Sequence, residues 1–233
     1  MSQSLVSAEL RQRVRGLATP VALAFGRIGL TPNALTVIGF LGTGAAAIAA
    51  ASQSWLLAGI FVIAFGIFDL FDGALARATG KTSKFGAFLD STLDRTGENL
   101  VLAGVAFGCA VAGFSLGTLL AALAMAFASV VTYTRAKAES LGVHGEVGVA
   151  PRSERLVILA VGLVAAGLLG GVTPFVILNT CGVDCPASTA SQSAGGGALA
   201  IALGLIAALS AVTVLQRIVH VRRQLDTNQQ ENQ

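Results

Sequence analysis

The sequence predicts an all-α protein: a polytopic membrane bundle of six transmembrane helices with an N-terminal amphipathic interfacial helix. Hydrophobic residues make up 54% of the 233 residues and charged residues only 12%, whereas a soluble domain carries about 25% charged residues. Several apolar runs also reach the roughly 20 residues that a helix needs to cross a bilayer. The basic residues gather at one end of these runs, which indicates a fixed orientation in a membrane.

Residues 1–30 are predicted to form the amphipathic helix. Their apolar residues recur every three or four positions and form a single stripe, and Arg11 and Arg15 lie off it. The stripe consists of Leu10, Val14, Leu17, Val21, Phe25 and Ile28. A helix of this kind is typical of the headgroup plane of a membrane. Packing of the helix against cytosolic loops is the alternative.

The six spans are predicted to form one domain, residues 31–220. They are expected at about residues 33–52, 55–78, 86–112, 116–137, 155–172 and 197–217. The breaks at 52–54 and 113–115 are short, so the helices that they join are expected to be antiparallel neighbours. The polar residues 221–233 are expected to be a disordered cytoplasmic tail.

All fifteen basic residues lie on one side of the predicted membrane domain. They occur before the first span, between the second and third, between the fourth and fifth, and after the sixth. The positive-inside rule then places both termini and these connections in the cytoplasm of a multi-pass cell-membrane protein. The long loop on the other side contains Asp184, Cys181 and Cys185. These two cysteines can form a disulfide in an oxidising compartment or remain free thiols.

Four aspartates lie where the second and third spans meet. Asp69 and Asp72 are three residues apart, and Asp90 and Asp94 are four apart, so each pair shares one face of a helix. The connection "ATGKTSK" is short enough to make the two helices antiparallel. The sequence therefore predicts that the four carboxylates meet near the cytoplasmic end of the bundle.

Carboxylates crowded in this way repel and desolvate one another unless a cation joins them. A set of oxygen ligands suits Mg²⁺ or Mn²⁺ better than zinc. Four carboxylates can hold two such ions, an arrangement used for displacement at phosphorus. Gly73, Ala76 and Gly86 leave room for a bulky ligand beside them, and Arg77 can bind a phosphate oxygen. Pairing of the acids with nearby lysines and arginines is the structural alternative.

The pattern Asp69-x2-Asp72-Gly73-x2-Ala76-Arg77-x8-Gly86-x3-Asp90-x3-Asp94 resembles, at every fixed position, the signature of the CDP-alcohol phosphotransferases. These integral membrane enzymes make phospholipid headgroup linkages. The resemblance extends to the amphipathic first helix, the six spans and the "LTPNALT" stretch that leads into the first span.

The resemblance implies a role for each residue of the site. Asp69, Asp72 and Asp90 would bind two Mg²⁺ ions, with Mn²⁺ as a substitute, and Asp94 would complete the metal site and act as the general base. The cytidine diphosphate of a CDP-diacylglycerol-type lipid would contact Pro32, Asn33, Ala34, Leu35, Gly73, Arg77, Ser83 and Gly86. Attack by an acceptor hydroxyl at the lipid-side phosphorus would release CMP.

A second set of residues, near the cytoplasmic ends of the last three spans, is predicted to bind the phosphate of an anionic acceptor. The set comprises Thr132, Arg135, Lys137, Arg152, Arg155 and Arg217. Ordinary positive-inside residues are the alternative. The stretches "TYTRAKAE" and "RSERL" resemble those that build the inositol-phosphate pocket in phosphatidylinositol phosphate synthases, with Arg135 and Lys137 exchanged in type. The expected acceptor is inositol 1-phosphate, and glycerol 3-phosphate is the alternative.

A metal-ion transporter is the alternative of another class, because carboxylates within a membrane commonly mark ion pathways. Such carboxylates belong near the middle of the membrane, whereas these are predicted at one end. The family resemblance also implies a homodimer, and no nucleic-acid partner is expected. Gly104-x3-Gly108 permits close helix packing, either within one bundle or between two chains.

Overall fold

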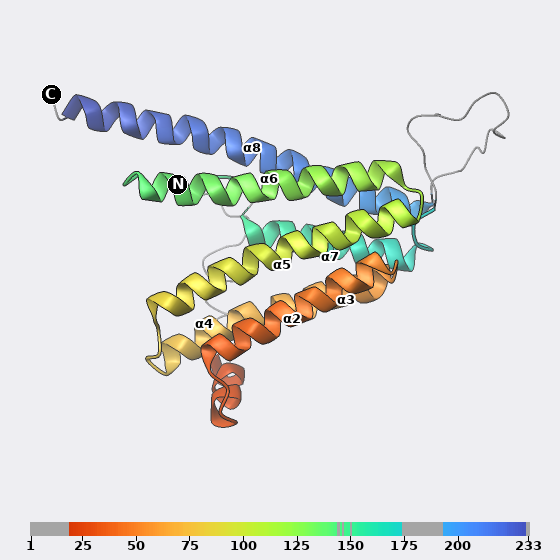
Figure 1. Cartoon of the computed structure of the whole chain (residues 1–233), viewed down its shortest axis with the longest axis horizontal. Helices are drawn as coiled ribbons and strands as arrows, with labels where there is room; N and C mark the ends of the chain where they lie inside the picture. The colour runs from red at the N-terminus through yellow and green to blue at the C-terminus, as the bar shows by residue number, and fades with distance from the viewer. Residues whose placement is uncertain (1–18, 144, 146, 150, 174–192, 232–233) are drawn as a thin grey trace.

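The computed structural model describes residues 19–143, 145, 147–149, 151–173 and 193–231, and every regular element in these residues is an α-helix (Figure 1). The prediction of an all-α protein is therefore confirmed for this part of the chain. After a helical segment at residues 19–27, the labelled helices are α2 (Pro32–Ala51), α3 (Trp55–Gly66), α4 (Phe68–Ala78), α5 (Lys84–Val111), α6 (Ser115–Ser140), α7 (Arg152–Leu168) and α8 (Ala194–Glu231).

Six of these helices form a closed ring in the order α2, α5, α6, α8, α7, α3, in which each helix packs against the next. The short α4 packs against α2 and α3. The interior of the ring is filled by small and branched apolar side chains from all six helices, such as Ala50, Val105, Leu163 and Leu203. In this order α5 and α7 lie across the ring from each other, so contacts between them must cross the interior of the bundle.

The contact between α5 and α2 depends on two glycines. A Cβ atom at Gly104 would lie 2.2 Å from the carbonyl oxygen of Ala47, and one at Gly108 would lie 2.2 Å from that of Ala50. Real Cβ atoms do not approach a carbonyl oxygen so closely, so a side chain at either position would push the helices apart. The Gly104-x3-Gly108 pattern thus serves packing within one chain.

The second predicted span, residues 55–78, is divided into α3 and α4. The helix is interrupted at Ile67, directly after Gly66, although Ile67 itself keeps right-handed helical angles. Phe61, Phe65 and Phe68 form successive ring contacts across this break. The interruption places Asp69 in the first turn of α4, where the positive end of the helix dipole favours a carboxylate.

Four helical stretches of the described chain are long and apolar enough to cross a bilayer: Pro32–Ala51, Trp55–Ala78, Ser115–Ser140 and Ala194–Thr227. The predicted six spans included α5 and α7 as well. The first fifteen of the 28 residues of α5 include Asp90, Asp94, Arg95 and Glu98. α7 has only 17 residues, with a charged first turn. The prediction of these two spans depends on the apolar residues that follow the charged ones in each helix.

The C-terminal end of the chain differs from the sequence expectation, whereas the predicted N-terminal helix is described only in part. The tail expected to be disordered continues α8, which is 38 residues long and ends at Glu231, or about 57 Å at roughly 1.5 Å per residue. Of the predicted amphipathic helix, residues 1–18 lie outside the described part of the chain. Within residues 19–27, Ala22 is buried against Leu35 and Leu75, so this segment docks on α2 and α4. Cys181 and Cys185 also lie outside the described residues.

Candidate active site

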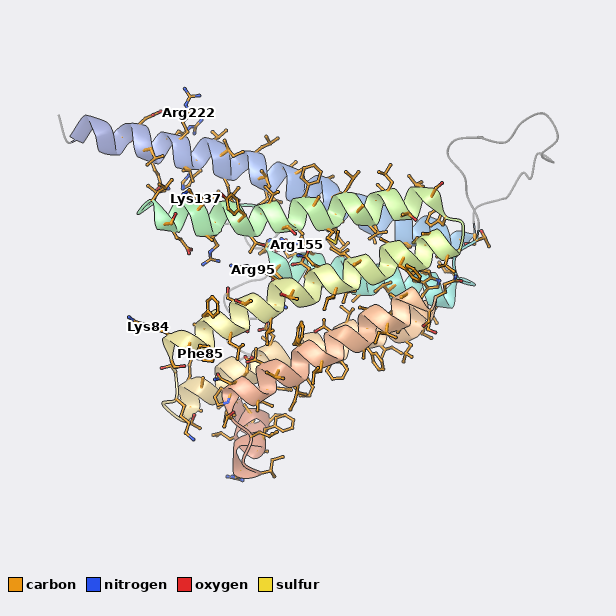
Figure 2. All side chains as sticks on the ribbon, in the orientation of Figure 1. Lys84, Phe85, Arg95, Lys137, Arg155 and Arg222 are labelled. Atoms are coloured by element: carbon orange, nitrogen blue, oxygen red, sulfur yellow. The ribbon has the colours of Figure 1, made fainter. Side chains whose placement is uncertain are left out.

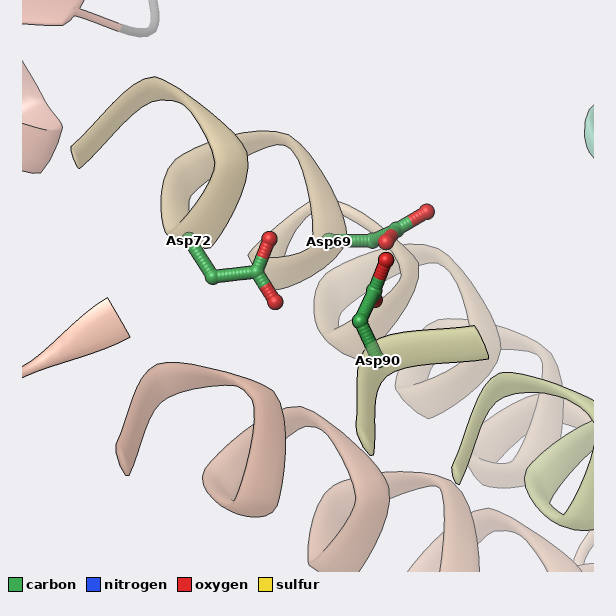
Figure 3. Close-up of side chains that lie close together, drawn as sticks. All are labelled: Asp69, Asp72 and Asp90. Carbon is green, nitrogen blue, oxygen red and sulfur yellow. The ribbon is translucent and has the colours of Figure 1, made fainter. Parts of the chain in front are cut away.

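Three of the four aspartates meet in the structure. Asp69 and Asp72 project from α4 and Asp90 from the facing turn of α5, and one carboxylate oxygen of each lies within 4.8 Å of the others (Figure 3). This proximity follows from the spacing in the sequence, because each pair of aspartates shares one helix face and the 79–83 connection brings α4 and α5 together.

The surroundings of these carboxylates suit a divalent cation. Asp72 is 6% exposed, and one of its oxygens, Oδ2, accepts a hydrogen bond of 2.6 Å from Thr36 Oγ1. Asp90 Oδ1 is buried and has no hydrogen-bond partner within the described part of the chain. A buried anionic oxygen without a partner is unfavourable, and a cation bound by all three carboxylates would satisfy it. The ligand atoms are all oxygens, which Mg²⁺ and Mn²⁺ prefer.

The fourth aspartate, Asp94, is held by an arginine. Arg152 is the first residue of α7, and its Nη1 contacts Asp94 Oδ2 and also lies 3.1 Å from Asp69 Oδ2. Asp69, Asp72, Asp94 and Arg152 border a small cavity of about 30 Å³ between α2, α3 and α5. One guanidinium group therefore joins the metal-binding cluster to the predicted general base.

A larger cavity, of about 190 Å³, opens beside Asp72 and Asp90. Six of the eight residues predicted to contact the CDP-lipid border it: Pro32, Asn33, Gly73, Arg77, Ser83 and Gly86. A Cβ atom at Gly86 would lie 3.0 Å from Ser83 Oγ and 3.1 Å from Asn33 Oδ1. Glycine at this position thus keeps the wall of the cavity clear.

Ala34 and Leu35 do not border this cavity. The backbone N–H of Ala34 donates to Thr31 Oγ1, which caps α2. Leu35 is fully buried in the small cluster beneath residues 19–27. Because Leu35 has no exposed surface, the structure gives it a packing role beneath the cavity.

Four residues that the sequence does not assign to the cavity also border it: Thr36, Lys81, Thr82 and Ala87. Thr36 follows Pro32 by four residues, so it occupies the same face of α2, and this spacing was the available signal. Lys81 and Thr82 lie in the short 79–83 connection, where the sequence alone indicates for Lys81 only a pairing with the acids. Lys81 adds a cation to a cavity that is bordered on the other side by aspartates.

The structure does not bring the predicted acceptor-binding residues of α6 and α8 together with the aspartates. Arg135 pairs with Glu139 at 2.8 Å on the surface. Lys137 borders a separate groove between the ends of α6 and α8 that also contains Arg222 (Figure 2). Thr132 borders a third cavity, of about 270 Å³, between α5 and α6. Arg217 is buried and donates to the carbonyl oxygens of Val147, at 2.7 Å, and Val131.

Arg155, the remaining predicted residue, forms a buried ion pair with Glu98. Its Nε lies 2.7 Å from Glu98 Oε1 and its Nη2 lies 2.9 Å from Oε2. Arg155 is 3% exposed and Glu98 4% exposed. Among the basic residues predicted to hold the acceptor phosphate, Arg152 is the one that the described structure places against the aspartates.

A helical membrane bundle with a carboxylate cluster beside a basic, glycine-walled cavity defines a class, the metal-dependent phosphotransferases of membranes. The sequence profile of the CDP-alcohol phosphatidyltransferases matches residues 29–222. The chain belongs to this family of enzymes, as its aspartate motif predicted.

Two relatives within the family are named as synthases of inositol phosphate lipids. The chain is 38% identical to a phosphatidylinositol phosphate synthase of Cutibacterium acnes over 88% of its length and 91% of that protein's. It is 38% identical to an archaetidylinositol phosphate synthase of Methanothermobacter thermautotrophicus over 69% of its length and 78% of that protein's.

Crystal structures of the Mycobacterium tuberculosis phosphatidylinositol phosphate synthase resemble the chain at 28% identity. The structure with CDP-DAG bound superposes with a TM-score of 0.72 and covers 88% of this chain and 92% of that one. The structure in complex with manganese and citrate superposes equally well and covers 88% of each chain.

Proposed function

We propose that the protein transfers the phosphatidyl group of a CDP-diacylglycerol-type lipid to a hydroxyl group of inositol 1-phosphate, releasing CMP. In this reaction the acceptor oxygen forms a bond to the lipid-side phosphorus, and the bond from that phosphorus to the CMP oxygen breaks. The observation that carries the proposal is that Arg152 contacts both Asp94 and Asp69. An acceptor phosphate bound at Arg152 would bring the rest of the acceptor next to the general base.

The cavity of about 190 Å³ is the proposed site of the cytidine diphosphate. Arg77 and Lys81 supply cations for phosphate oxygens, and Asn33 and Ser83 supply hydrogen-bonding groups in the lining of the same cavity. A relative of the same fold is named as binding CDP-DAG, which supports the assignment.

Asp69, Asp72 and Asp90 are the residues that would hold two divalent ions, with Asp94 completing the set. When bound, such ions neutralise the diphosphate and stabilise the leaving phosphate. Thr36 orients Asp72 through its hydrogen bond. We assign to Asp94 the removal of the proton from the attacking hydroxyl, because it lies outside the three-carboxylate cluster and beside Arg152. Manganese in the mycobacterial relative supports a divalent cofactor.

The proposal for the acceptor rests on charge. Arg152 offers a planar cationic group that suits a phosphate. Once the carboxylates that contact Arg152 bind metal, the guanidinium needs another negative ligand. An acceptor phosphate would supply that ligand, whereas a neutral acceptor would not. The relatives from Cutibacterium acnes and Methanothermobacter thermautotrophicus take their names from inositol phosphate products. Arg155 is not part of this proposal for phosphate binding, because its guanidinium is buried against Glu98.

We further propose the membrane arrangement that the charges predict: six spans including α5 and α7, residues 1–30 as an interfacial helix, and both termini and the site on the cytoplasmic side. The apolar second half of α5 and most of α7 continue the bundle beside the four longer stretches. A homodimer in the membrane is proposed from the family resemblance.

The test is CMP release from CDP-diacylglycerol by the purified protein with Mg²⁺ and a panel of acceptors: inositol 1-phosphate, glycerol 3-phosphate, inositol and serine. We expect inositol 1-phosphate to give the highest kcat/KM and removal of Mg²⁺ to abolish release. The matched control is Asp94→Asn, which keeps the shape of the site but lacks the base.

Each other outcome has a definite meaning. Release that is fastest with glycerol 3-phosphate would assign the protein to the phosphatidylglycerophosphate synthases. Release that is fastest with inositol or serine would contradict the phosphate-binding role of Arg152. Metal flux across vesicles without CMP release would support the transporter alternative, which the family membership disfavours.

A further inference from the structure

A buried ion pair lies one helical turn behind the catalytic contact. On α5, Glu98 follows Asp94 by four residues, and on α7, Arg155 follows Arg152 by three, so each pair of residues shares a helix face. Arg152 binds Asp94 and Arg155 binds Glu98. The two helices are therefore joined by two adjacent ion pairs of the same polarity, with acids on α5 and arginines on α7.

The two ion pairs connect helices that are not neighbours in the ring. α5 packs against α2 and α6, whereas α7 packs against α3 and α8. The position of the first turn of α7 relative to α5 is thus fixed across the interior of the bundle by these side chains. Of the two pairs, Arg155–Glu98 is the enclosed one: both residues are under 5% exposed and the contact is bidentate, at 2.7 and 2.9 Å. Arg152 is more accessible, with 27% of its side chain exposed.

We propose that the Arg155–Glu98 pair is a positioning device, which holds the start of α7 so that Arg152 reaches Asp94 and Asp69. A bidentate arginine–carboxylate contact fixes both distance and orientation. Arg152, one turn away on the same helix, then needs little reorganisation to accept the acceptor phosphate. The inference rests on the proposed function, because it concerns the residue to which that function assigns the phosphate.

Stability alone does not account for this pair well. A buried ion pair often contributes no more to stability than apolar side chains of similar volume, because desolvation of both charges offsets their attraction. An apolar pair at these positions would hold the helices together but would not fix their register. Replacing the ion pair by an apolar pair should therefore preserve the unfolding temperature but change the binding of the acceptor.

The experiment compares the wild-type protein with the double variant Glu98→Leu/Arg155→Met, which removes both charges and keeps the volume. Its thermal unfolding temperature is expected to equal or exceed the wild-type value. Its KM for inositol 1-phosphate is expected to rise about tenfold to a hundredfold, since a small displacement of a binding group has effects of this size. The KM for the CDP-lipid is expected to stay within about twofold, because the nucleotide cavity contains neither residue.

Two further variants complete the design. Glu98→Gln leaves the Arg155 charge buried without its partner, so this variant is expected to unfold at a lower temperature and serves as the measure of a purely structural defect. Asp226→Asn breaks the exposed Arg222–Asp226 pair, at 3.8 Å on α8, and controls for the loss of an ion pair elsewhere. It should change neither KM.

A double-mutant cycle with Arg152→Ala decides whether the pair acts through Arg152. If it does, the Leu/Met variant has little further effect on kcat/KM once Arg152 is replaced. Effects that multiply would mean that Arg155 contacts the acceptor itself, and would overturn the proposal, as would a folded Leu/Met variant with the wild-type acceptor KM. An unchanged acceptor KM in Arg152→Ala would refute the phosphate assignment instead, and the cycle in kcat would still test the positioning role.

Discussion

The proposed nucleotide side of the site is assembled from α2, α4 and α5, whereas the sequence predicts the acceptor side from residues on α6, α7 and α8. On the nucleotide side, six of eight predicted residues border one cavity and three of four aspartates meet. On the acceptor side, Arg152 reaches the aspartates, while Arg135, Lys137 and Arg217 each have other surroundings. The difference teaches that a spacing pattern within one helical hairpin specifies a site, whereas basic residues from separate connections can serve topology or packing.

The largest expected effect concerns the aspartate outside the cluster. Asp94→Asn should lower kcat by a factor of about 10² to 10⁴, the usual contribution of a general base. Mn²⁺ should still bind to the three remaining carboxylates, and the CDP-lipid should still bind in its cavity. Single-turnover CMP release and Mn²⁺ titration of the purified variant measure the two parts. A kcat near the wild-type value at saturating substrate would show that another group is the base.

Arg152→Ala is the next largest and tests the acceptor side directly. Loss of a charge-assisted hydrogen bond worth roughly 1.5–3 kcal/mol should raise the KM for inositol 1-phosphate about tenfold to a hundredfold. The KM for CDP-diacylglycerol is expected to change little. Equal changes for both substrates would mean that the arginine serves the metal cluster and not the acceptor.

Arg217→Ala is the matched contrast, because it removes an arginine of the same predicted set that is buried on α8. Its guanidinium donates to the carbonyl oxygens of Val131 and Val147, and each unsatisfied buried acceptor costs about 1–3 kcal/mol. The expected result is a lower unfolding temperature with an unchanged acceptor KM in the folded fraction. A stable variant with a raised acceptor KM would return Arg217 to the phosphate site.

Gly86→Ala sharpens the nucleotide side. The added methyl group would lie 3.0 Å from Ser83 Oγ and would displace this wall of the cavity. If the displacement weakens CDP-lipid binding by about 1 kcal/mol, the size of a mild overpacking cost, the KM for the CDP-lipid should rise roughly fivefold. Gly44→Ala on α2 is the control, since nothing lies within 4 Å of a Cβ atom there. If both variants behave alike, the wall at Gly86 does not contact the nucleotide.

The smallest effect is expected for Lys137→Ala. Lys137 borders the groove between α6 and α8 together with Leu141 and Arg222, and the surface charge should alter the acceptor KM by less than about twofold after screening by salt. Steady-state kinetics at two ionic strengths provide the measurement. A rise as large as that of Arg152→Ala would restore the sequence expectation and remove the contrast between the two sides.

Helix geometry explains which parts of the fold and site were predictable. The two aspartate pairs, the 79–83 connection and the all-α architecture follow from local periodicity and hydropathy. The division at Ile67 and the helical tail to Glu231 are not contained in the hydropathy pattern: the apolar run continues through Ile67, and the tail is polar, with local contacts such as Arg222–Asp226 four residues apart. Arg155 and Glu98 are 57 positions apart, and their pairing required the three-dimensional arrangement of α5 and α7.

The order of the helices in the ring also bears on the synthesis of the protein. The aspartates of the carboxylate cluster lie on α4 and α5, which are adjacent in the chain, so the last of them, Asp90, is synthesised well before Arg152. Arg152 emerges later, on α7, and α7 gains its second neighbour only when α8 is made. A nascent chain therefore carries the carboxylates before it carries Arg152, and the proposed acceptor side is the last part of the site to be synthesised.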